Sequence, residues 1–586
     1  MMRELKGMFD YSVVGDERFS VELSAEQPES GIELVHMKLH SDEAVAPTQL
    51  KLCFGVPLKR AFAVWRPNLD TDRAIPLPWA QPMQSCSTNG APIACVLAND
   101  RNTLTIAVSD AMNIVKIFFA ANEQTAVSAS YVSFFSTPTA PLTDYEVTVR
   151  LDKRDIFYGD AVAAVSDWWA GFDGYTPAHV PEYARLPMYS TWYSMHQKMT
   201  AAEIEKQSAL AKEVGCESII VDDGWQTEDN SLGYAYTGDW EVCESKMGDM
   251  AAHVRRVHDI GLKYLVWYSV PFMGYKAKLA DKYADKKLCD KDNWQCYVLD
   301  PRYKEIRDYL IGTYKKALDD WDLDGFKLDF VDSFTQPAAY EELPDLGRDE
   351  QSVPKAVDTL LSDVIDTLRQ TKPEIMVEFR QHYIGPLMRK YGNMFRATDC
   401  PLDPLRNRIR TIDVRLLCGS TAAHADMIKW NADERVEDAA YHIIAILFSV
   451  PQISVLLDEV PQEHREMIKF YLSLWKEYRS VLLDGKFRAY APDQLYPVVT
   501  GETESTLFAA VYDERIVPVA SAKQEIVIAA ATDCGHVYVD FYGSFGEYDA
   551  VVYSCTGKVV QRSTVTAEGV KKLSVPQSGV IKLIKR

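Results

Sequence analysis

The sequence lacks any hydrophobic run of transmembrane length, and its N-terminus, Met1-Met-Arg-Glu-Leu-Lys-Gly, lacks the apolar centre of a signal peptide. Its 11 cysteines show no Cys-x-x-Cys spacing and no pairing pattern, which favours reduced thiols and a cytoplasmic location. Positive charge is in short supply, because 63 Lys and Arg face 84 Asp and Glu, for a net charge of −21. We therefore expect neither a nucleic-acid partner nor an anionic-membrane partner, since both need a basic surface.

Both ends of the chain are patterned as β structure. At 586 residues the chain is long enough for several domains. Residues 1–170 contain alternating or β-branched runs that predict an antiparallel β-sandwich followed by a helical link: 32–39, 49–54, 103–108, 145–151 and the helix 160–169. Residues 483–586 return to short strands, at 507–512, 525–530, 536–541 and 551–554, and predict a small C-terminal β-sandwich.

The middle of the chain, residues 171–482, alternates short apolar strands with amphipathic helices, one of which opens with the capping box Thr200-Ala-Ala-Glu203. Eight strands are expected, at 188–193, 218–221, 263–270, 325–330, 375–379, 394–397, 421–427 and 453–457. Eight βα units in about 300 residues predict a (β/α)8 TIM barrel. A doubly wound sheet is the alternative, but no Gly-rich phosphate loop supports it.

In such a barrel the active site lies at the carboxyl ends of the strands. Carboxylates, indoles and cations gather at these predicted ends: Trp192; Asp222, Asp223 and Trp225; Trp267; Lys327, Asp329 and Asp332; Arg380; Arg396 and Asp399; His424 and Asp426. Carboxylates accept hydrogen bonds from sugar hydroxyls, and an indole offers a flat face to the C–H groups of a sugar ring. The alternative for Asp222-Asp-Gly-Trp225 is an ordinary turn with a packed Trp.

Two of the carboxylates form a candidate catalytic pair. Asp329 and Asp399 end the fourth and sixth strands, from which they can face one another across the barrel mouth. Glycoside hydrolysis needs one protonated carboxyl group and one ionised carboxylate. Lys327 lies two residues before Asp329, on the same side of the strand, where its charge favours the ionised form. A single Asp at a barrel mouth can equally be a loop cap or half of a salt bridge.

A catalytic metal is the competing interpretation. His424-x-Asp426 places two potential ligands on one strand face, but no second His-x-His or His-x-x-Glu-His motif is present among the 11 histidines. We therefore expect no metal and no other cofactor. His424 is also explained as a hydrogen-bonded histidine of the site or of the core.

The motifs Asp222-Asp-Gly-Trp225, Phe326-Lys-Leu-Asp-Phe330 and Phe395-Arg-Ala-Thr-Asp399 resemble those of the α-galactosidases of glycoside hydrolase family 36, related to families 27 and 31. The order β-sandwich, barrel, β-sandwich is similar as well. Leu299-Asp-Pro-Arg302 and Ser449-Val-Pro-Gln-Ile-Ser-Val455 add to the likeness, and Val64-Trp-Arg-Pro67 is the N-terminal segment that shares it.

The resemblance implies a retaining double displacement on a terminal α-linked sugar, with Asp329 as the nucleophile and Asp399 as the general acid/base. It further implies that Asp222 and Asp223 hold the O4 and O6 hydroxyls of a galactose. Trp225, Lys327 and Arg396 would line the same subsite, with Trp192, Trp267, Asp332, His424 and Asp426 nearby. Trp65 would cap the pocket from the N-terminal domain.

The fifth strand departs from the family pattern, since Glu378-Phe-Arg380 stands where typical members carry a Cys-rich and Gly-rich loop. Arg380 fits an N-acetylated, charged or otherwise modified sugar, or else a structural ion pair with Glu378 or Asp329. The leading interpretation is an α-galactosidase with a small-molecule carbohydrate substrate. A transglycosidase, an enzyme for a different α-sugar and a non-catalytic sugar-binding barrel remain alternatives, and homo-oligomer formation is left open.

Overall fold

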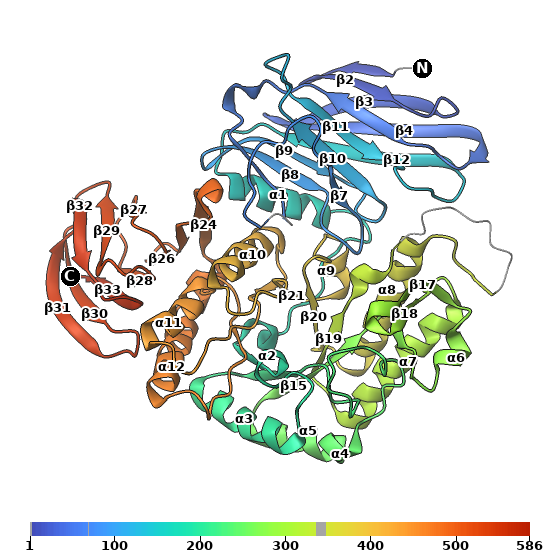
Figure 1. Ribbon diagram of the computed structural model, residues 1–586. Coiled ribbons are helices and arrows are strands. Elements are labelled where there is room, and N and C mark those ends of the chain that lie inside the picture. The colour runs from blue at the N-terminus through green and yellow to red at the C-terminus, as the bar shows by residue number, and fades with distance from the viewer. Residues whose placement is uncertain (1–2, 68–69, 336–346) are drawn as a thin grey trace.

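The computed structural model describes residues 3–67, 70–335 and 347–586. At its centre lies a parallel sheet, of which β15, β19, β20 and β21 are labelled in Figure 1. Its strands follow the order β22-β21-β20-β19-β15-β14-β13-β23. An isolated parallel bridge between His424 and Val450 nearly closes this sheet into a ring. The predicted (β/α)8 barrel with flanking β domains is confirmed. The strands are β13 (Met188–Ser190), β14 (Ser218–Val221), β15 (Lys263–Ser269), β19 (Gly325–Asp329), β20 (Met376–Arg380), β21 (Met394–Arg396), β22 (Ala422–His424) and β23 (Gln452–Ile453).

Amphipathic helices cover the outside of the barrel. The Thr200 hydroxyl accepts a hydrogen bond from the Glu203 amide, as the predicted capping box requires, and Gly215 ends the helix in a left-handed conformation. The longer helices are α3 (Ala201–Val214), α5 (Met250–Ile260), α7 (Lys304–Trp321), α8 (Val353–Thr371), α10 (Pro404–Leu417), α11 (Val436–Ala445) and α12 (Gln462–Glu477). Short helices are α2 (Trp192–Met195), α4 (Glu244–Met247), α6 (Ala280–Tyr283), α9 (Met388–Tyr391) and α13 (Arg479–Asp484).

Three barrel strands end three or more residues earlier than the sequence pattern predicts. β13 stops at Ser190 and the chain turns into α2, while β22 ends at His424 and β23 at Ile453. The Ser454 hydroxyl accepts hydrogen bonds at 3.0 Å from the amides of Tyr193 and Ser194, so side-chain bonds replace ladder bonds at this edge. Apolar residues that continue these runs, among them Tyr193, Met427 and Val455, are buried without extending the strands.

The barrel interior changes from apolar to polar along its axis. Its lower layer is a small cluster made by Met188, Ile220, Leu265, Met376 and Met394, one from each of five strands. Two residues further along β20 and β21, on the same side of each strand, come Glu378 and Arg396, which are fully buried. The alternation of the strands therefore places a buried charged layer directly under the residues at the mouth.

The N-terminal part is a sandwich of two six-stranded sheets around its own apolar core. Helix α1 (Tyr158–Ala170) joins this sandwich to the barrel: the Trp169 indole donates to the Val108 carbonyl, and the Ser166 hydroxyl donates to the Leu417 carbonyl of α10. One sheet contains β1 (Glu4–Lys6), β2 (Asp10–Val14), β5 (Leu50–Phe54), β7 (Met83–Ser85), β10 (Val115–Ala120) and β11 (Ala129–Phe134). The other contains β3 (Ser20–Glu29), β4 (Ile32–Val45), β6 (Ala63–Trp65), β8 (Ile93–Ala98), β9 (Arg101–Val108) and β12 (Leu142–Asp152).

The C-terminal part packs a seven-stranded sheet on a three-stranded sheet, again around a separate apolar core. The larger sheet contains β24 (Lys486–Tyr490), β25 (Val498–Glu502), β26 (Thr506–Val511), β28 (Glu525–Ala530), β30 (Glu547–Tyr553), β31 (Val559–Thr566) and β33 (Gly579–Lys585). The smaller sheet contains β27 (Ile516–Val519), β29 (His536–Phe541) and β32 (Gly569–Ser574).

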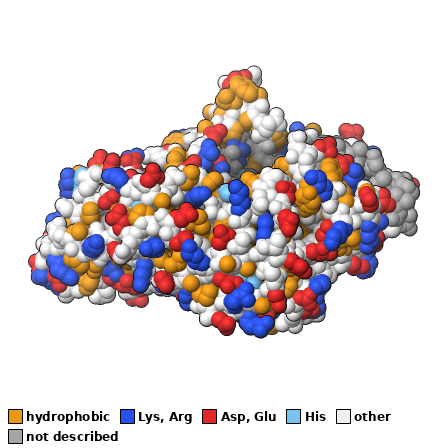
Figure 2. All heavy atoms as spheres, turned by 60° about the horizontal axis from the view of Figure 1, so that its bottom comes forward, with side chains coloured by type: hydrophobic (Ala, Val, Ile, Leu, Met, Phe, Trp, Pro, Cys, Tyr) orange, Lys and Arg blue, Asp and Glu red, His pale blue; other side chains and the backbone are white. Residues whose placement is uncertain are grey.

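A small antiparallel sheet interrupts the barrel between β15 and α7. It is formed by β16 (Phe272–Gly274), β18 (Cys296–Leu299) and β17 (Lys287–Lys291), and it projects beside the barrel in Figure 1. The face shown in Figure 2 intersperses acidic, basic and apolar side chains. In the described ranges, no helix combines the length and apolarity needed to span a bilayer.

Candidate active site

Asp329, the last residue of β19, is the most heavily hydrogen-bonded carboxylate at the barrel mouth. Its Oδ1 accepts bonds from the Phe330 amide at 2.8 Å, Arg380 Nε at 2.8 Å and the Tyr383 hydroxyl at 2.7 Å. Its Oδ2 accepts a bond from Trp267 Nε1 at 3.1 Å, and Lys327 Nζ lies 3.9 Å from the same oxygen. Only 5% of the residue is exposed. Two cations and a phenol thus surround a nearly buried carboxylate.

This environment decides the charge of Asp329. Burial acts to raise its pKa, but the charges of Arg380 and Lys327 and the Tyr383 hydrogen bond outweigh burial and hold the pKa well below its ordinary value. The carboxylate is therefore ionised at neutral pH. One oxygen, Oδ2, has a single hydrogen-bond donor among the described residues, so it retains lone-pair capacity.

Asp399 follows β21 and has a half-exposed side chain. Its Oδ1 accepts a bond from Arg396 Nη2 at 2.9 Å, and its backbone carbonyl accepts one from Arg410 Nη1 at 2.8 Å. Burial acts to raise the pKa of Asp399, and the charges of Arg396 and Lys327 outweigh it and lower the pKa. The ligand-free protein therefore favours the ionised form of this carboxyl group.

Arg396 is fully buried and is held from three sides. Besides Asp399, it donates to Asp426 Oδ1, and its Nε lies 3.4 Å from Glu378 Oε1. Asp426 also accepts bonds from the Tyr193 hydroxyl at 3.0 Å and the Cys400 amide at 2.7 Å. Because all its partners are protein groups, Asp426 supports Arg396 and has no exposed surface for a ligand. Burial raises the pKa of Asp426 to about 6.

Asp222 and Asp223, at the end of β14, face different partners. Lys327 Nζ donates to Asp222 Oδ2 at 2.6 Å, which links this carboxylate to the Asp329 side of the site. Asp223 accepts bonds from Gln197 Nε2 at 2.7 Å and Gln226 Nε2 at 2.6 Å. Burial raises the pKa of Asp223 to about 6, against the lowering effect of these two amides. The structure therefore brings Asp222, Lys327 and Asp329 together, as the sequence pattern predicts.

His424 does not reach the mouth. Its Nε2 donates to the Ala184 carbonyl at 2.8 Å and its Nδ1 accepts from Gln452 Nε2 at 3.1 Å, so both ring nitrogens are satisfied inside the barrel. Burial lowers the pKa of His424 to about 4, so the ring is neutral. These contacts favour the alternative of a structural histidine over direct contact with a substrate. Among the described residues, no three His, Cys, Asp or Glu side chains form a metal-binding group.

Trp225 and Trp65 are also placed differently from the expectation. Trp225 is fully buried: its indole donates to the Trp267 carbonyl at 3.0 Å, and its ring packs on Tyr268 and Trp321, between the strands and α7. The preceding residue, Gly224, has φ of 125°, a conformation that favours glycine. Trp65 is fully buried against α10, where it donates to Asp413 Oδ1 at 2.8 Å, and it does not cap a pocket.

The remaining predicted residues lie around the mouth. Trp192 is partly exposed on α2, where it meets His196 edge to face at 4.9 Å. Trp267 faces Asp329, as described above. Asp332 lies one turn beyond Asp329, and burial raises its pKa despite the nearby charge of Arg380. Arg380 pairs with Asp329, which is the structural alternative considered from the sequence, and its guanidinium also lies over the Phe330 ring at 5.2 Å.

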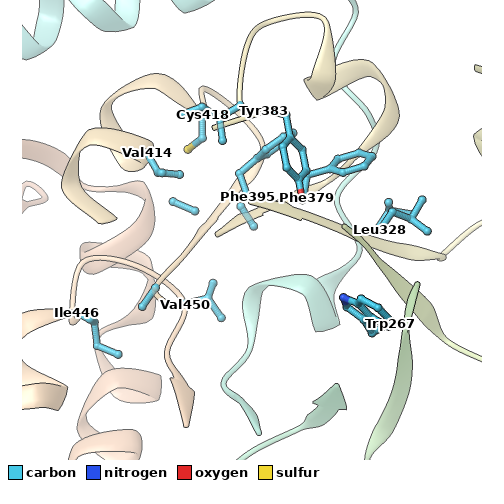
Figure 3. Packing of buried hydrophobic residues seen from close by; sticks show 14 of the residues in the cluster. Trp267, Leu328, Phe379, Tyr383, Phe395, Val414, Cys418, Ile446 and Val450 are labelled. Carbon is cyan, nitrogen blue, oxygen red and sulfur yellow. The ribbon is translucent and has the colours of Figure 1, made fainter. Parts of the chain in front are cut away.

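Sequence reasoning missed several residues of the cluster. Tyr383 is fully buried, and Figure 3 shows it grouped with Phe379 and Phe395. Gln381 accepts from the Thr398 amide at 3.0 Å and donates to the Pro67 carbonyl at 3.2 Å, so it joins β20, β21 and the N-terminal sandwich. None of these contacts follows a strand or helix period. The one available signal was the closeness of Tyr383 to the unusual Arg380.

Two large cavities lie elsewhere in the molecule. One, of about 680 Å³, lies between α11 and turns of the C-terminal sheets. The other, of about 720 Å³, lies between the N-terminal sheet that contains β3, β4 and β12 and the segment after α1. No predicted site residue lines either cavity. The candidate site is therefore identified by its convergent charged groups rather than by cavity size.

Part of the chain is similar to known proteins. A family model described as Melibiase matches residues 182–381, which span β13 to β20. The α-galactosidase Mel36A of Lactobacillus acidophilus is 30% identical over 173 residues, covering 28% of this chain and 22% of that protein. An α-galactosidase of Escherichia coli is 23% identical over 351 residues, covering 56% of this chain and 47% of that protein. The matched segments thus span less than half of either curated relative.

The solved structures extend the likeness to the whole architecture. The family 36 α-galactosidase AgaA of Geobacillus stearothermophilus, in a complex with raffinose, superposes with a TM-score of 0.66 at 14% identity, covering 98% of this chain and 83% of that one. At this identity the superposition shows a shared fold. The melibiase match and the curated relatives show that the barrel region is similar to α-galactosidases.

Proposed function

We propose that this protein is a retaining, exo-acting α-glycosidase, with terminal α-galactosides as the leading substrates. Asp329 is the nucleophile and Asp399 the general acid/base. The observation that carries the proposal is the environment of Asp329: an ionised, nearly buried carboxylate at a barrel-strand end, fixed by three donors on Oδ1 and left with capacity on Oδ2. The pKa of a second carboxylate, Asp399, is lowered by the charges of Arg396, Lys327 and Arg380, all of which also act on Asp329.

In the first step Asp329 Oδ2 attacks the anomeric carbon. The bond from that carbon to the glycosidic oxygen breaks, and the leaving oxygen takes the proton of Asp399. The product is a glycosyl ester of Asp329, with Asp399 left ionised. Because Arg380, Tyr383 and the Phe330 amide all bind Oδ1, they fix the plane of the carboxylate and keep Oδ2 directed at the sugar.

In the second step the ionised Asp399 takes a proton from water as the water oxygen attacks the anomeric carbon. The ester bond breaks and Asp329 recovers its charge. Because the anomeric carbon undergoes two successive displacements, the sugar leaves with its original anomeric configuration. Arg396 favours the ionised form of Asp399, which suits this base step. An alcohol in place of water gives transglycosylation by the same route.

Asp222 and Asp223 supply the proposed grip on the sugar hydroxyls. Asp222 accepts a hydrogen bond from Lys327, and Asp223 accepts one from Gln197. Both carboxylates lie at the end of β14, two strands from Asp329 in the sheet order. In this proposal residues 171–482 carry the site, and residues 1–170 and 483–586 are the flanking domains. We further propose a cytoplasmic location, in keeping with 11 unpaired cysteines.

A modified sugar is the second candidate, and Arg380 favours it. Its Nε binds Asp329 and its Nη1 donates to the Gln381 carbonyl at 2.7 Å, while Nη2 has no hydrogen-bond acceptor among the described residues. A free guanidinium N–H beside the nucleophile suits an acetamido oxygen or an anionic group on the sugar. A panel of aryl α-glycosides that includes galactoside and N-acetylgalactosaminide separates the two candidates.

The central test is hydrolysis of an aryl α-galactoside by wild type and by Asp329→Ala. The variant should lose at least about a thousandfold in kcat, because no group remains to form the ester. Added azide should restore part of the turnover and give the β-galactosyl azide, since the small anion attacks from the vacated side. Asp308→Ala, an exposed position on α7, is the matched control and should keep wild-type activity. Full activity of Asp329→Ala would disprove the nucleophile assignment.

A further inference from the structure

A continuous line of aromatic rings runs from Asp329 to the protein surface. Trp267, whose indole binds Asp329, lies 6.3 Å from the Tyr234 ring. Tyr234 lies 5.1 Å from Phe330 and 5.6 Å from Trp294, and Phe330 lies 5.7 Å from Trp294. We call Trp267, Tyr234, Phe330 and Trp294 the aromatic shelf. Exposure increases along it, from 2% at Trp267 to 40% at Trp294.

Three separate segments hold the shelf together. The Tyr234 amide donates to the Trp294 carbonyl at 3.2 Å, which fastens the loop after β14 to the turn between β17 and β18. Phe330 has φ of 63°, a left-handed conformation that is unusual for a bulky residue. Its amide bonds to both Asp329 Oδ1 and the Tyr383 hydroxyl stabilise that conformation. Strained backbone directly after the proposed nucleophile thus directs the Phe330 ring toward Tyr234 and Trp294.

The shelf combines apolar faces with one free hydroxyl. The rings of Tyr234, Phe272 and Phe330 meet Trp294 at 59–67°, so no ring is stacked flat on it, while the Lys291 ammonium lies 5.7 Å from its centroid. The Tyr234 hydroxyl has no hydrogen-bond partner among the described residues. Burial, followed by the charges of Asp223, Asp329 and Asp222, raises the pKa of Tyr234, so its hydroxyl lies within the field of the site carboxylates and stays protonated.

We infer that the aromatic shelf binds the part of the substrate beyond the sugar held at Asp329, a second sugar ring or an aryl group. This inference rests on the proposed function. Trp267 contacts Asp329 directly, whereas Trp294 is at the exposed end of the shelf, so we expect Trp294 to contact only substrates that extend beyond the sugar at Asp329. Aromatic faces bind the C–H faces of sugars and the rings of aryl groups, and the Tyr234 hydroxyl offers a hydrogen bond at the junction.

The test compares substrates that do and do not extend to Trp294. kcat/KM is measured for α-galactosyl fluoride, an aryl α-galactoside and raffinose, with wild type, Trp294→Ala, Trp294→Phe and the control Trp79→Ala. Trp79 is 68% exposed in the N-terminal part. Trp294→Ala should lower kcat/KM for raffinose and the aryl galactoside about three- to tenfold, as expected for one lost ring contact. It should leave the fluoride within about twofold, and Trp294→Phe should recover most of the loss.

The outcomes separate the shelf from the proposed function. An equal loss on all three substrates, no loss on raffinose, or an equal loss in Trp79→Ala overturns the shelf while the glycosidase activity stands. If wild type hydrolyses none of the three substrates, the proposed α-galactosidase function is wrong. The proposed role of the shelf in binding the rest of a galactoside is then wrong as well.

Discussion

Arg396 opposes the proton-donor role proposed for Asp399. With its pKa lowered below the ordinary value, the carboxyl group is protonated in a fraction of molecules that falls about tenfold for each pH unit above that pKa. We therefore expect kcat/KM for a substrate with a poor leaving group to fall steadily from pH 5 to pH 7. A substrate whose leaving group needs no proton, such as the galactosyl fluoride, should be nearly flat over the same range.

The measurement is the ratio of kcat/KM for the substrate with the poor leaving group to kcat/KM for the fluoride at each pH. Asp223 and Asp426 have pKa values raised to about 6, and their titration affects both substrates alike, so it cancels in this ratio. Asp329 contributes nothing in this range, since its pKa is held well below it. A ratio that stays constant or rises with pH would show that Asp399 does not donate the proton.

Tyr383 is a positioning residue for Asp329. Tyr383→Phe removes a 2.7 Å bond to an ionised carboxylate, and bonds to charged groups contribute about 1.5–3 kcal/mol. We expect kcat to fall about ten- to a hundredfold with a smaller change in KM, because the carboxylate loses orientation rather than the sugar losing contacts. The pKa of Asp329 should also rise, since the lost bond favours its ionised form, and an acid limb in kcat should move to higher pH.

A matched control distinguishes orientation from general loss of packing. Tyr471 is another fully buried tyrosine whose hydroxyl is bonded, in this case to the Ser578 carbonyl at 2.5 Å. Tyr471→Phe should cost comparable stability and leave both kcat and the acid limb unchanged. If the two variants reduce kcat equally, Tyr383 acts only through the fold.

At the scale of elements, α10 carries several groups that support the site. Arg410 donates to the Asp399 carbonyl, and Asn407 Nδ2 donates to the Asp426 carbonyl at 2.9 Å. The helix begins at Pro404, and the Asp403 side chain caps it by accepting from the Arg406 amide at 2.9 Å. The position at which α10 begins therefore determines where Arg410 and Asn407 contact the residues that follow β21 and β22.

Asp403→Ala should lower the free energy of unfolding by about 1 kcal/mol through the lost cap. We expect a change of less than about twofold in kcat/KM, because Arg410 and Asn407 lie at least one turn inside the helix. Denaturant titration and steady-state kinetics of the same preparation test both parts, with Asp403→Ser as the variant that retains a cap. A large loss of activity without loss of stability would place Asp403 itself in the site.

Strong periodicity allowed the elements to be predicted from the sequence. β14 has the predicted bounds 218–221, and the predicted helix start at Thr200 is present, because buried alternation and capping leave local signals. The eighth strand was predicted at 453–457 but covers Gln452–Ile453, since the apolar run continues past the point where Ser454 turns to cap α2. Run length alone does not show where a strand ends.

The site was less predictable, because its contacts join elements that are distant in sequence. The strand period predicts that Lys327 lies on the same side as Asp329, and Lys327 Nζ lies 3.9 Å from Asp329 Oδ2; its contact with Asp222 had no local signal. The strand period gave no sign that Trp225, directly after a glycine with φ of 125°, is fully buried. A Cβ on Gly224 would lie 2.6 Å from Gln197 Cα, so the turn depends on that glycine. Tyr383 and Tyr234 had no periodic signal at all.

At the scale of the whole molecule, one buried carboxylate joins the three parts of the chain. Asp413 of α10 accepts bonds from Trp65 Nε1 at 2.8 Å and Arg73 Nη2 at 2.6 Å, both from the N-terminal part, and from the Tyr496 hydroxyl at 2.6 Å, on the C-terminal side. Arg73 is almost fully buried. The N-terminal sandwich thus meets the barrel through a buried charged junction as well as through apolar contact.

Asp413→Ala should be strongly destabilising, because it leaves Arg73 as a buried charge without its partner. Breaking a buried pair in this way costs about 3–5 kcal/mol. We expect a lower denaturant midpoint by tryptophan fluorescence, and earlier proteolytic cleavage between the N-terminal sandwich and the barrel, since Trp65 and Arg73 lose their common partner. The exposed pair of Asp155 with Arg101 is the control: Asp155→Ala should hardly move the midpoint, because water already screens that pair. If both variants unfold at the wild-type midpoint, the junction does not hold the parts together, and the apolar packing of α1 against α10 must do so.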